Sequence, residues 1–176
     1  MEPHRASLDG HTINGRCSTF AGIRVISSVS QVRVLGPGTI SNFDVGLRAA
    51  GNSKDSFAKF TTVTANCPFL TTGFEIVGPA SHWELQGNVV REPGSTSVGI
   101  LLQSTDHNHL VANDVNDTIA LVDSSNNVIA NNISDDNNVG IGLERFATGS
   151  NNNEIHANTT NNNTYGIEIF LGSKPE

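Results

Sequence analysis

A unit of four residues, in which glycine is followed by an apolar, a variable and an apolar residue, returns along most of the chain. Its copies begin at Gly22, Gly46, Gly73, Gly99, Thr118, Gly140 and Gly166, and threonine replaces glycine once. The first and last copies are 144 residues apart over six intervals, which gives a mean period of 24 residues. Alternation of inward and outward residues over four positions is typical of a β-strand. A regular series of short strands restricts the chain to a repeat architecture.

A second unit repeats in phase with the first, an apolar residue, or threonine in the copy at Thr39, followed three positions later by asparagine. It is clearest in Leu110-Val111-Ala112-Asn113-Asp114-Val115 and in Val128-Ile129-Ala130-Asn131-Asn132-Ile133. Its asparagines are Asn42, Asn66, Asn88, Asn113, Asn131 and Asn158. Asparagine tolerates positive φ, so we place each of these residues at a tight bend between two strands. Stacked coils lie about 4.8 Å apart, and we therefore expect the asparagine amides to hydrogen-bond along the stack as a structural ladder.

The repeat and the composition together predict an all-β solenoid. The chain contains 21 Asn and 17 Gly among its 176 residues, and no segment keeps an apolar pattern of helical period. We expect three short strands in each coil: strand one is the glycine unit, strand two ends before the ladder asparagine and strand three begins after it. The prediction is a single domain over residues 1–176, with about seven coils of ~24 residues between about residues 8 and 172.

These two units resemble those of the right-handed parallel β-helix superfamily, the pectate-lyase-like proteins that include carbohydrate-binding and sugar-hydrolase-type repeat proteins. The resemblance implies that an oligosaccharide or polysaccharide binds on the exposed face of strand one and the loops beside it. It also implies polysaccharide lyase or glycoside hydrolase activity. However, the catalytic motifs of polygalacturonases, alginate epimerases and pectate lyases are absent from the sequence, so whether the protein is an enzyme stays open at this point.

The strand-one face contains the candidate catalytic and sugar-binding side chains. Asp123 and Glu144 leave strand one at nearly the same point on adjacent coils, so we expect their Cα atoms to be about 5 Å apart. Two carboxylates this close can divide the acid and base roles of glycoside hydrolysis, and Arg145 is next in sequence. Outward positions of the same strand and its end give three candidate substrate-binding residues: Gln103, Glu75 and Glu168. The competing interpretation is a solvated polar rim.

A group of histidines gives a different hypothesis, a metal-binding β-helix. His107 and His109 alternate within residues 106–109, and His82 has a similar offset one coil earlier. Imidazole is a preferred ligand of zinc and copper. A short polar loop supplies little fixed geometry, so surface histidines are the competing interpretation. The sequence has no concentrated aspartate cluster for calcium, and we expect no cofactor.

The charge and the cysteines restrict the partners and the compartment. With 10 Lys and Arg against 17 Asp and Glu, the formal net charge is -7, which argues against nucleic acid, since that affinity comes from basic side chains at phosphates. We expect no membrane contact, because no apolar run is long enough to span a bilayer, and the first residues do not resemble a signal peptide.

Cys17 and Cys67 are two coils apart, about 9.6 Å along the stack, which is too far for a disulfide. We predict two free thiols, compatible with a reducing compartment, although proteins of the superfamily are often exported.

The end of the repeat favours a further hypothesis, a non-catalytic structural or assembly module. The last glycine unit, within residues 166–172, leaves a bare strand, and exposed strand edges invite pairing. We expect either that the chain is a fragment of a longer β-helix or that it forms a homo-oligomer through Phe170 and Leu171.

The single tryptophan, Trp83, has an inward phase in the strand pattern, so we place it in the core.

Overall fold

The computed structural model describes residues 3–17, 20–26, 28–64, 67, 71–91, 97–145 and 147–170. These residues form 20 β-strands and no helix. The strands belong to three parallel sheets, which we call sheets A, B and C. Successive strands along the chain enter the three sheets in turn as far as β19, and the last strand, β20, follows directly in sheet C. Among the described residues, there is no helix long and apolar enough to cross a membrane.

The strands are short, and each pairs in parallel with strands of the neighbouring coils. Sheet A contains β1 (Arg5–Ser7), β4 (Arg33–Leu35), β7 (Lys54–Lys59), β10 (Ser81–Gln86), β13 (His109–Val111), β16 (Val128–Ala130) and β19 (Glu154–His156). Sheet B contains β2 (Thr12–Asn14), β5 (Thr39–Ser41), β8 (Thr62–Thr64), β11 (Val89–Arg91), β14 (Asp114–Val115) and β17 (Ile133–Ser134). Sheet C contains β3 (Ala21–Val25), β6 (Val45–Ala49), β9 (Thr72–Val77), β12 (Val98–Gln103), β15 (Thr118–Val122), β18 (Val139–Glu144) and β20 (Tyr165–Phe170).

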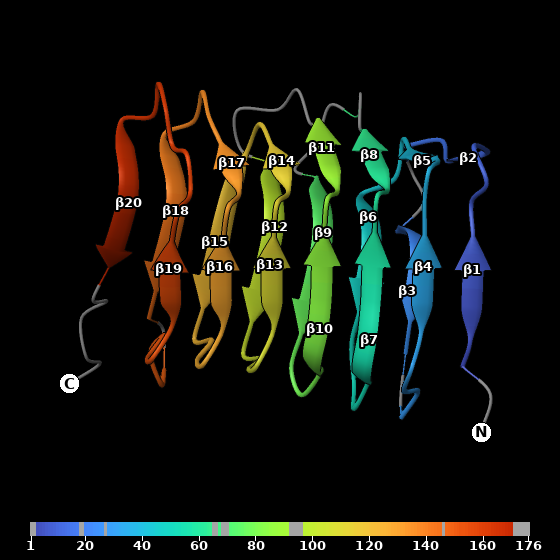
Figure 1. The fold of residues 1–176 in the computed structure, drawn as a ribbon, viewed down its shortest axis with the longest axis horizontal. Helices are drawn as coiled ribbons and strands as arrows, with labels where there is room; N and C mark the ends of the chain where they lie inside the picture. The colour runs from blue at the N-terminus through green and yellow to red at the C-terminus, as the bar shows by residue number, and fades with distance from the viewer. Residues whose placement is uncertain are drawn as a thin grey trace.

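The coils stack side by side along one axis (Figure 1). Strand β1 lies at one end of the stack and β20 at the other, so position in the sequence follows position along the axis. Sheets A and C have seven strands each and sheet B has six. The prediction of an all-β solenoid of about seven coils is therefore confirmed, and the glycine units are the strands of sheet C.

The core is a column of apolar side chains that point inward from all three sheets. Ile100 of sheet C, Leu85 of sheet A and Val90 of sheet B are all 0% exposed. Trp83 is also in the core, as predicted, with 1% of its surface exposed. Its Nε1–H donates to Oγ of Ser53 at 3.2 Å, so the one polar group of the buried indole is satisfied.

Glycine begins the sheet C unit because successive coils approach each other closely there. A Cβ atom on Gly73 would lie 2.5 Å from the carbonyl oxygen of Gly99 on the next coil and 2.6 Å from Cγ1 of Val90 in sheet B. Cβ atoms on Gly46 and Gly140 would meet a carbonyl oxygen of the next coil at 2.6 Å in the same way. A side chain at these positions would push two coils apart, so the repeated glycine is a packing requirement.

An asparagine ladder runs along the bend between sheets A and B. Its members are Asn88, Asn113, Asn132 and Asn158. The side-chain Nδ2 of each member donates to Oδ1 of the next, at 3.0, 2.9 and 3.1 Å along the series. The same Oδ1 atoms also accept the backbone N–H of the preceding member, at 3.1, 2.9 and 2.8 Å. The ladder therefore satisfies backbone donors at a buried turn, where no strand pairing is available.

One ladder position differs from the expected residue: it is occupied by Asn132 rather than Asn131. Asn131 has a φ of 57° and is exposed. Ala112 and Ala157, which precede the ladder residues of the coils on either side, have the same left-handed backbone, with φ of 55°. The left-handed residue and the ladder residue thus occupy two successive positions. The sequence prediction assigned both properties to a single asparagine.

Asn42 belongs to a different bend from the ladder. It follows β5 of sheet B, and its Nδ2 donates to Oδ1 of Asn14 at 2.8 Å. In the coil of β7 the ladder position is held by Thr61, whose N–H donates to Oδ1 of Asn88 at 3.0 Å. Asn66 lies outside the described residues. The sequence pattern could not separate the two bends, because short strands with an apolar centre precede both.

Cys17 and Cys67 form a disulfide, so the prediction of two free thiols is wrong. Their Sγ atoms are 2.16 Å apart and their Cα atoms 5.3 Å apart. The expected separation counted two full coil spacings, but the connection between β5 and β6 in the intervening coil contains only residues 42–44. Cys17, in the connection after β2, and Cys67, in the connection after β8, therefore approach each other across this short connection. The N–H of Cys17 donates to the carbonyl oxygen of Asn42 at 2.9 Å. The argument for a reducing compartment depended on free thiols and is therefore withdrawn, because disulfides persist mainly in oxidising compartments.

Candidate functional site

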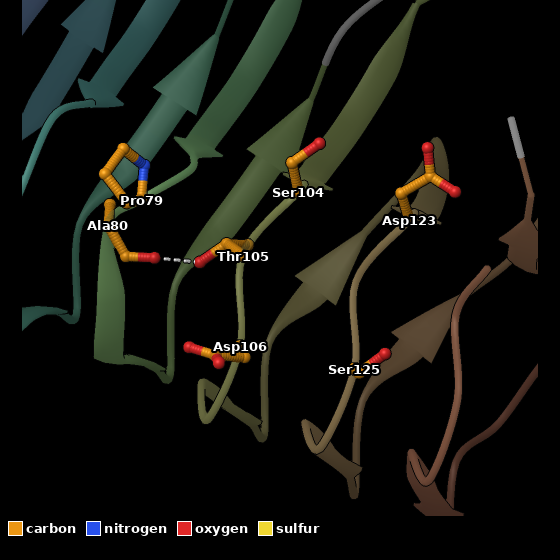
Figure 2. A pocket seen from close by; sticks show the side chains of 7 residues that line it. All are labelled: Pro79, Ala80, Ser104, Thr105, Asp106, Asp123 and Ser125. Atoms are coloured by element: carbon orange, nitrogen blue, oxygen red, sulfur yellow. Dashed lines mark hydrogen bonds between the residues drawn. The ribbon is translucent and has the colours of Figure 1, made fainter. Parts of the chain in front are cut away.

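The bend between sheets C and A carries a polar hollow, which we call the bend hollow. It spans the connections from β9 to β10, from β12 to β13 and from β15 to β16, and its volume is about 300 Å³. Figure 2 shows the residues that line it: Pro79, Ala80, Ser104, Thr105, Asp106, Asp123 and Ser125. Hydroxyl and carboxylate groups supply most of the polar atoms, and none of the lining residues is Lys or Arg.

Hydrogen bonds between successive coils fix the wall of the bend hollow. Oγ of Ser124 accepts the N–H of Thr105 at 3.3 Å, and Oγ of Ser150 accepts the N–H of Ser124 at 3.1 Å. The hydroxyl of Thr105 donates to the carbonyl oxygen of Ala80 on the preceding coil (Figure 2). Short polar side chains thus replace strand pairing where the chain turns, and they hold the three connections in register.

Asp123 lines the bend hollow and also binds the backbone of a neighbouring loop. Its Oδ1 accepts the N–H groups of Ala147, Thr148 and Gly149 at 3.0, 3.0 and 2.8 Å, and its Oδ2 accepts the N–H of Ala147 at 2.9 Å. Hydrogen bonds to an ionised acceptor are roughly twice as strong as neutral ones. Asp123 therefore anchors the loop that follows β18.

Ser104 and Asp106 present polar groups to the hollow with few partners in the protein. Both residues are exposed. Within the described residues, the Ser104 hydroxyl has no hydrogen-bond partner, and the Asp106 carboxylate meets only Nδ1 of His107, at 3.4 Å. The ring of His107 stacks on that of His82 from the preceding coil, with centroids 5.1 Å apart and planes 4° from parallel. The hollow thus contains two exposed polar groups, and the one from Asp106 connects it to the stacked histidine pair.

The outer face of sheet C carries a second hollow, which we call the sheet C groove. Its volume is about 410 Å³, and the residues that line it are Val98, Thr118, Ala120, Asn138, Val139, Gly142, Glu144, Glu168 and Phe170. Ala120 and Gly142 are paired outward residues of β15 and β18, and their small size leaves the face hollow there. Glu144 and Glu168 come from adjacent strands. Neither carboxylate forms an ion pair or hydrogen bond with any residue that the structure describes.

The structure directs the side chains of the expected catalytic pair into different hollows. Their backbones are adjacent, since the N–H of Asp123 donates to the carbonyl oxygen of Glu144 at 3.1 Å. Asp123 lines the bend hollow, whereas Glu144 lines the sheet C groove together with Glu168. Arg145 follows β18, half-buried, and its side chain lies beside Gly149. A shared catalytic role for Asp123, Glu144 and Arg145 stays a prediction.

The other two substrate-binding candidates have contrasting surroundings. Glu75 is 9% exposed, and its Oε2 lies 2.6 Å from Nη1 of Arg48, so its carboxylate is already paired. Gln103 is exposed at the end of β12, directly before Ser104 of the bend hollow. Of the two, Gln103 has the more accessible polar group.

The three histidines considered as metal ligands do not converge on a common point. His82 and His107 stack with nearly parallel rings, whereas His109 lies on β13, beside Val128 of the next strand. Over the part of the chain that the structure describes, no group of three or more His, Cys, Asp or Glu side chains is arranged to hold a metal ion. Metal binding by His82, His107 and His109 stays an alternative hypothesis, and the expectation of no cofactor stays a prediction.

Sequence reasoning misses Ser104, Asp106 and Ser125 as lining residues of one polar hollow. The signal that would have found them is a polar residue five and seven positions after the first residue of the repeated unit. Ser104 and Asp106 occupy these positions in one coil, and Asp123 and Ser125 occupy them in the next. A backbone bridge between Asp106 and Ser125 confirms that the positions stack.

Comparison with known proteins identifies the family. Residues 21–176 match the family model described as a right handed beta helix region. No curated protein and no solved structure matches the chain. The match spans all of sheet C, and the three-sheet parallel solenoid agrees with it. The chain therefore belongs to the right-handed β-helix family, as the two repeated sequence units predicted.

Proposed function

We propose that the protein is a carbohydrate-recognising β-helix domain and that the bend hollow is its binding site. The observation that carries this proposal is the gathering of hydroxyl and carboxylate groups from three successive coils in one concave site. Sugar hydroxyls donate and accept hydrogen bonds, so they are matched by serine and aspartate side chains held at fixed positions. A volume of about 300 Å³ lies at the lower end of the range for ligand pockets, which favours a short segment of an oligosaccharide.

The charge of the hollow favours a neutral sugar over an acidic one. Asp106 and Asp123 line the hollow, and no lining residue carries a positive charge to balance them. The whole chain has a formal net charge of -7. Chains of uronic acid would therefore be repelled both at the site and during approach, whereas neutral hydroxyls can donate to the carboxylates.

Within the hollow, three residues have distinct expected roles. The Ser104 hydroxyl and the Asp106 carboxylate are the direct contacts, because both are exposed and have little competition from protein partners. Asp123 is a positioning residue, because backbone N–H groups of residues 147–149 occupy its oxygens. The proposal is for binding; a catalytic role of Asp123, Glu144 and Arg145 would be tested by product analysis with any oligosaccharide that binds.

Titration calorimetry with neutral gluco-, manno-, galacto- and xylo-oligosaccharides tests the proposal. We expect one of these series to bind, and Asp106→Asn to weaken its affinity at least ~10-fold, as loss of a hydrogen bond to a charged group implies. Ser104→Gly should act in the same direction, and glycine suits its φ of 52°. Asp55→Asn is the matched control, an exposed aspartate near the start of β7, two coils earlier. Absence of binding by all four series, or equal losses in the Asp106 and Asp55 variants, would refute the site.

A further inference from the structure

We infer that two copies of this chain associate face to face through the outer face of sheet C, antiparallel along the stack. The two-fold axis lies along β12, the central strand of the seven in sheet C. In this arrangement β12 faces itself, β9 faces β15, β6 faces β18 and β3 faces β20. The surface is separate from the bend hollow, so the inference goes beyond the proposed function.

The outer face of sheet C carries a group of apolar side chains among its charged ones. Its outward positions include Val45, Val77, Val98, Leu101, Ala120, Val122 and Val139. Of these, Val77, Val98, Leu101 and Val139 are partly exposed, and apolar side chains grouped on one face commonly mark a site of protein association.

The central outward column of sheet C is complementary to itself when its order is reversed. From the first coil to the last it reads Arg24, Arg48, Glu75, Leu101, Ala120, Gly142 and Glu168. Reversal about the centre sets Leu101 against Leu101 and Glu75 against Ala120. It also sets Arg48 against Gly142 and Arg24 against Glu168. Glu75 and Arg48 therefore face small residues, Leu101 meets its own copy, and the terminal arginine faces a carboxylate, as a self-complementary isologous interface requires.

The sheet C groove is the recess that the long side chains of the second copy would fill. Arg48 and Glu75 form an ion pair on β6 and β9, and the reversed copy presents this pair over Gly142 and Ala120 of the groove. The groove also contains Glu144 and Glu168, two carboxylates without a partner among the described residues. The arginines of the second copy would supply the missing positive charge.

Arg24 is available for such a pair. Its guanidinium lies 5.9 Å from the ring centroid of Phe20, and Arg48 lies 5.0 Å from the same ring. Among the described residues, no carboxylate forms an ion pair with Arg24. The stacking on Phe20 holds the guanidinium on the sheet C side of the first coil, where Glu168 of the second copy would face it.

The column at the ends of the sheet C strands shows the same self-complementarity. From β9 to β20 it contains Val77, Gln103, Val122, Glu144 and Phe170. Reversal sets Val77 against Val122 and Gln103 against itself. It also sets Phe170, which is 58% exposed, near Ile26, which follows β3 and is 48% exposed. Two exposed apolar side chains would thus cover each other at both ends of the interface.

The distribution of charge along the stack selects the antiparallel arrangement. Residues 1–59 carry seven Lys and Arg against four Asp and Glu, a formal net charge of +3. Residues 60–176 carry three Lys and Arg against thirteen Asp and Glu, a formal net charge of -10. Two copies side by side in parallel would bring the acidic ends together, whereas the antiparallel pair sets each acidic end against a basic one.

The available area is sufficient for a specific but modest dimer. Seven strands about 4.8 Å apart and about five residues of 3.3 Å each give a face of roughly 34 by 17 Å. Two such faces bury about 1,150 Å² in total, just above the ~1,000 Å² expected of a biological interface. We therefore expect a dissociation constant in the micromolar range.

Sedimentation equilibrium between about 1 and 100 μM tests the inference. The wild-type chain should approach twice its mass of 18.6 kDa. Arg24→Glu and Glu168→Arg should each weaken association at least ~10-fold, because like charges then face each other twice in every dimer. A 1:1 mixture of the two variants should recover the wild-type association, because only the mixed dimer restores opposite charges at both ends.

Glu154→Arg is the matched control, since it reverses a charge in the same last coil but on sheet A. It should leave the mass unchanged, and circular dichroism should show the same β-sheet signal in all variants. A wild-type chain that stays monomeric at 100 μM would overturn the inference. So would a mixture of the two variants that stays monomeric, or a control that weakens association as much as Glu168→Arg.

Discussion

Replacing Asn132 or Asn131 by alanine makes the same chemical change at two successive residues and should give very different losses of stability. The Oδ1 of Asn132 accepts both the N–H and the Nδ2 of Asn113, each at 2.9 Å. Its Nδ2 donates to the carbonyl oxygens of Leu110 and Ala130 and to Oδ1 of Asn158, at 2.8, 3.1 and 3.1 Å. Asn132→Ala removes all five hydrogen bonds at a site that is 1% exposed.

The expected loss can be estimated from the partners left behind. The N–H of Asn113 becomes a buried donor without an acceptor, which costs about 1–3 kcal/mol. The remaining contacts contribute roughly 2 kcal/mol together, because Nδ2 of Asn113 keeps the carbonyl oxygen of Leu85 and Oδ1 of Asn158 keeps the N–H of residue 132. We expect Asn132→Ala to lower the unfolding free energy by about 4 kcal/mol and the Tm by roughly 8–16 °C.

Asn131→Ala should lower the unfolding free energy by less than about 1 kcal/mol and the Tm by less than roughly 4 °C. Asn131 is exposed, and alanine already adopts its left-handed conformation at Ala112 and Ala157. Thermal and urea unfolding followed by circular dichroism would measure both variants. Similar losses for the two substitutions, or a larger loss at Asn131, would show that the buried ladder is not the stabilising element.

Two further perturbations have defined outcomes. The double substitution Cys17→Ser and Cys67→Ser removes a cross-link between residues 50 apart in sequence. It should lower the unfolding free energy by about 4 kcal/mol. A reductant should cause the same loss of stability in the wild type and should not change the stability of the variant. Asp123→Ala removes the acceptor of three backbone N–H groups, so hydrogen exchange at residues 147–149 should rise at least ~10-fold, whereas Asp136→Ala should leave those amides unchanged.

The period and the inward residues of this fold were predictable because they depend on local pattern. Alternation in units such as Gly99-Ile100-Leu101-Leu102 identifies both the strand and its buried face, and glycine marks a close approach of coils. The identity of the ladder residue was not predictable where two asparagines are adjacent. Asn131 and Asn132 have the same side chain, and only the backbone φ separates the turn from the ladder.

The cross-link and the hollows depend on differences between coils, which an average period conceals. Cys17 and Cys67 meet because one intervening connection has only three residues, 42–44. The direction of the Asp123 carboxylate follows from the loop at residues 147–149, and nothing in the strand pattern specifies that loop. The backbone adjacency of Asp123 and Glu144 was thus predictable, whereas the separation of their carboxylates was not.

The disulfide also sets the mechanical behaviour of the stack under tension. A solenoid pulled from its ends peels one coil at a time, since each coil contacts only its neighbours. The bond between Cys17 and Cys67 places the whole second coil inside a closed loop of the chain. The roughly 50 residues in this loop cannot be extended while the bond is intact. Reduction of the bond would therefore add roughly 170 Å of extended chain. A thiol reductant would therefore increase the length to which this protein can be extended, and the added length would come from the first three coils.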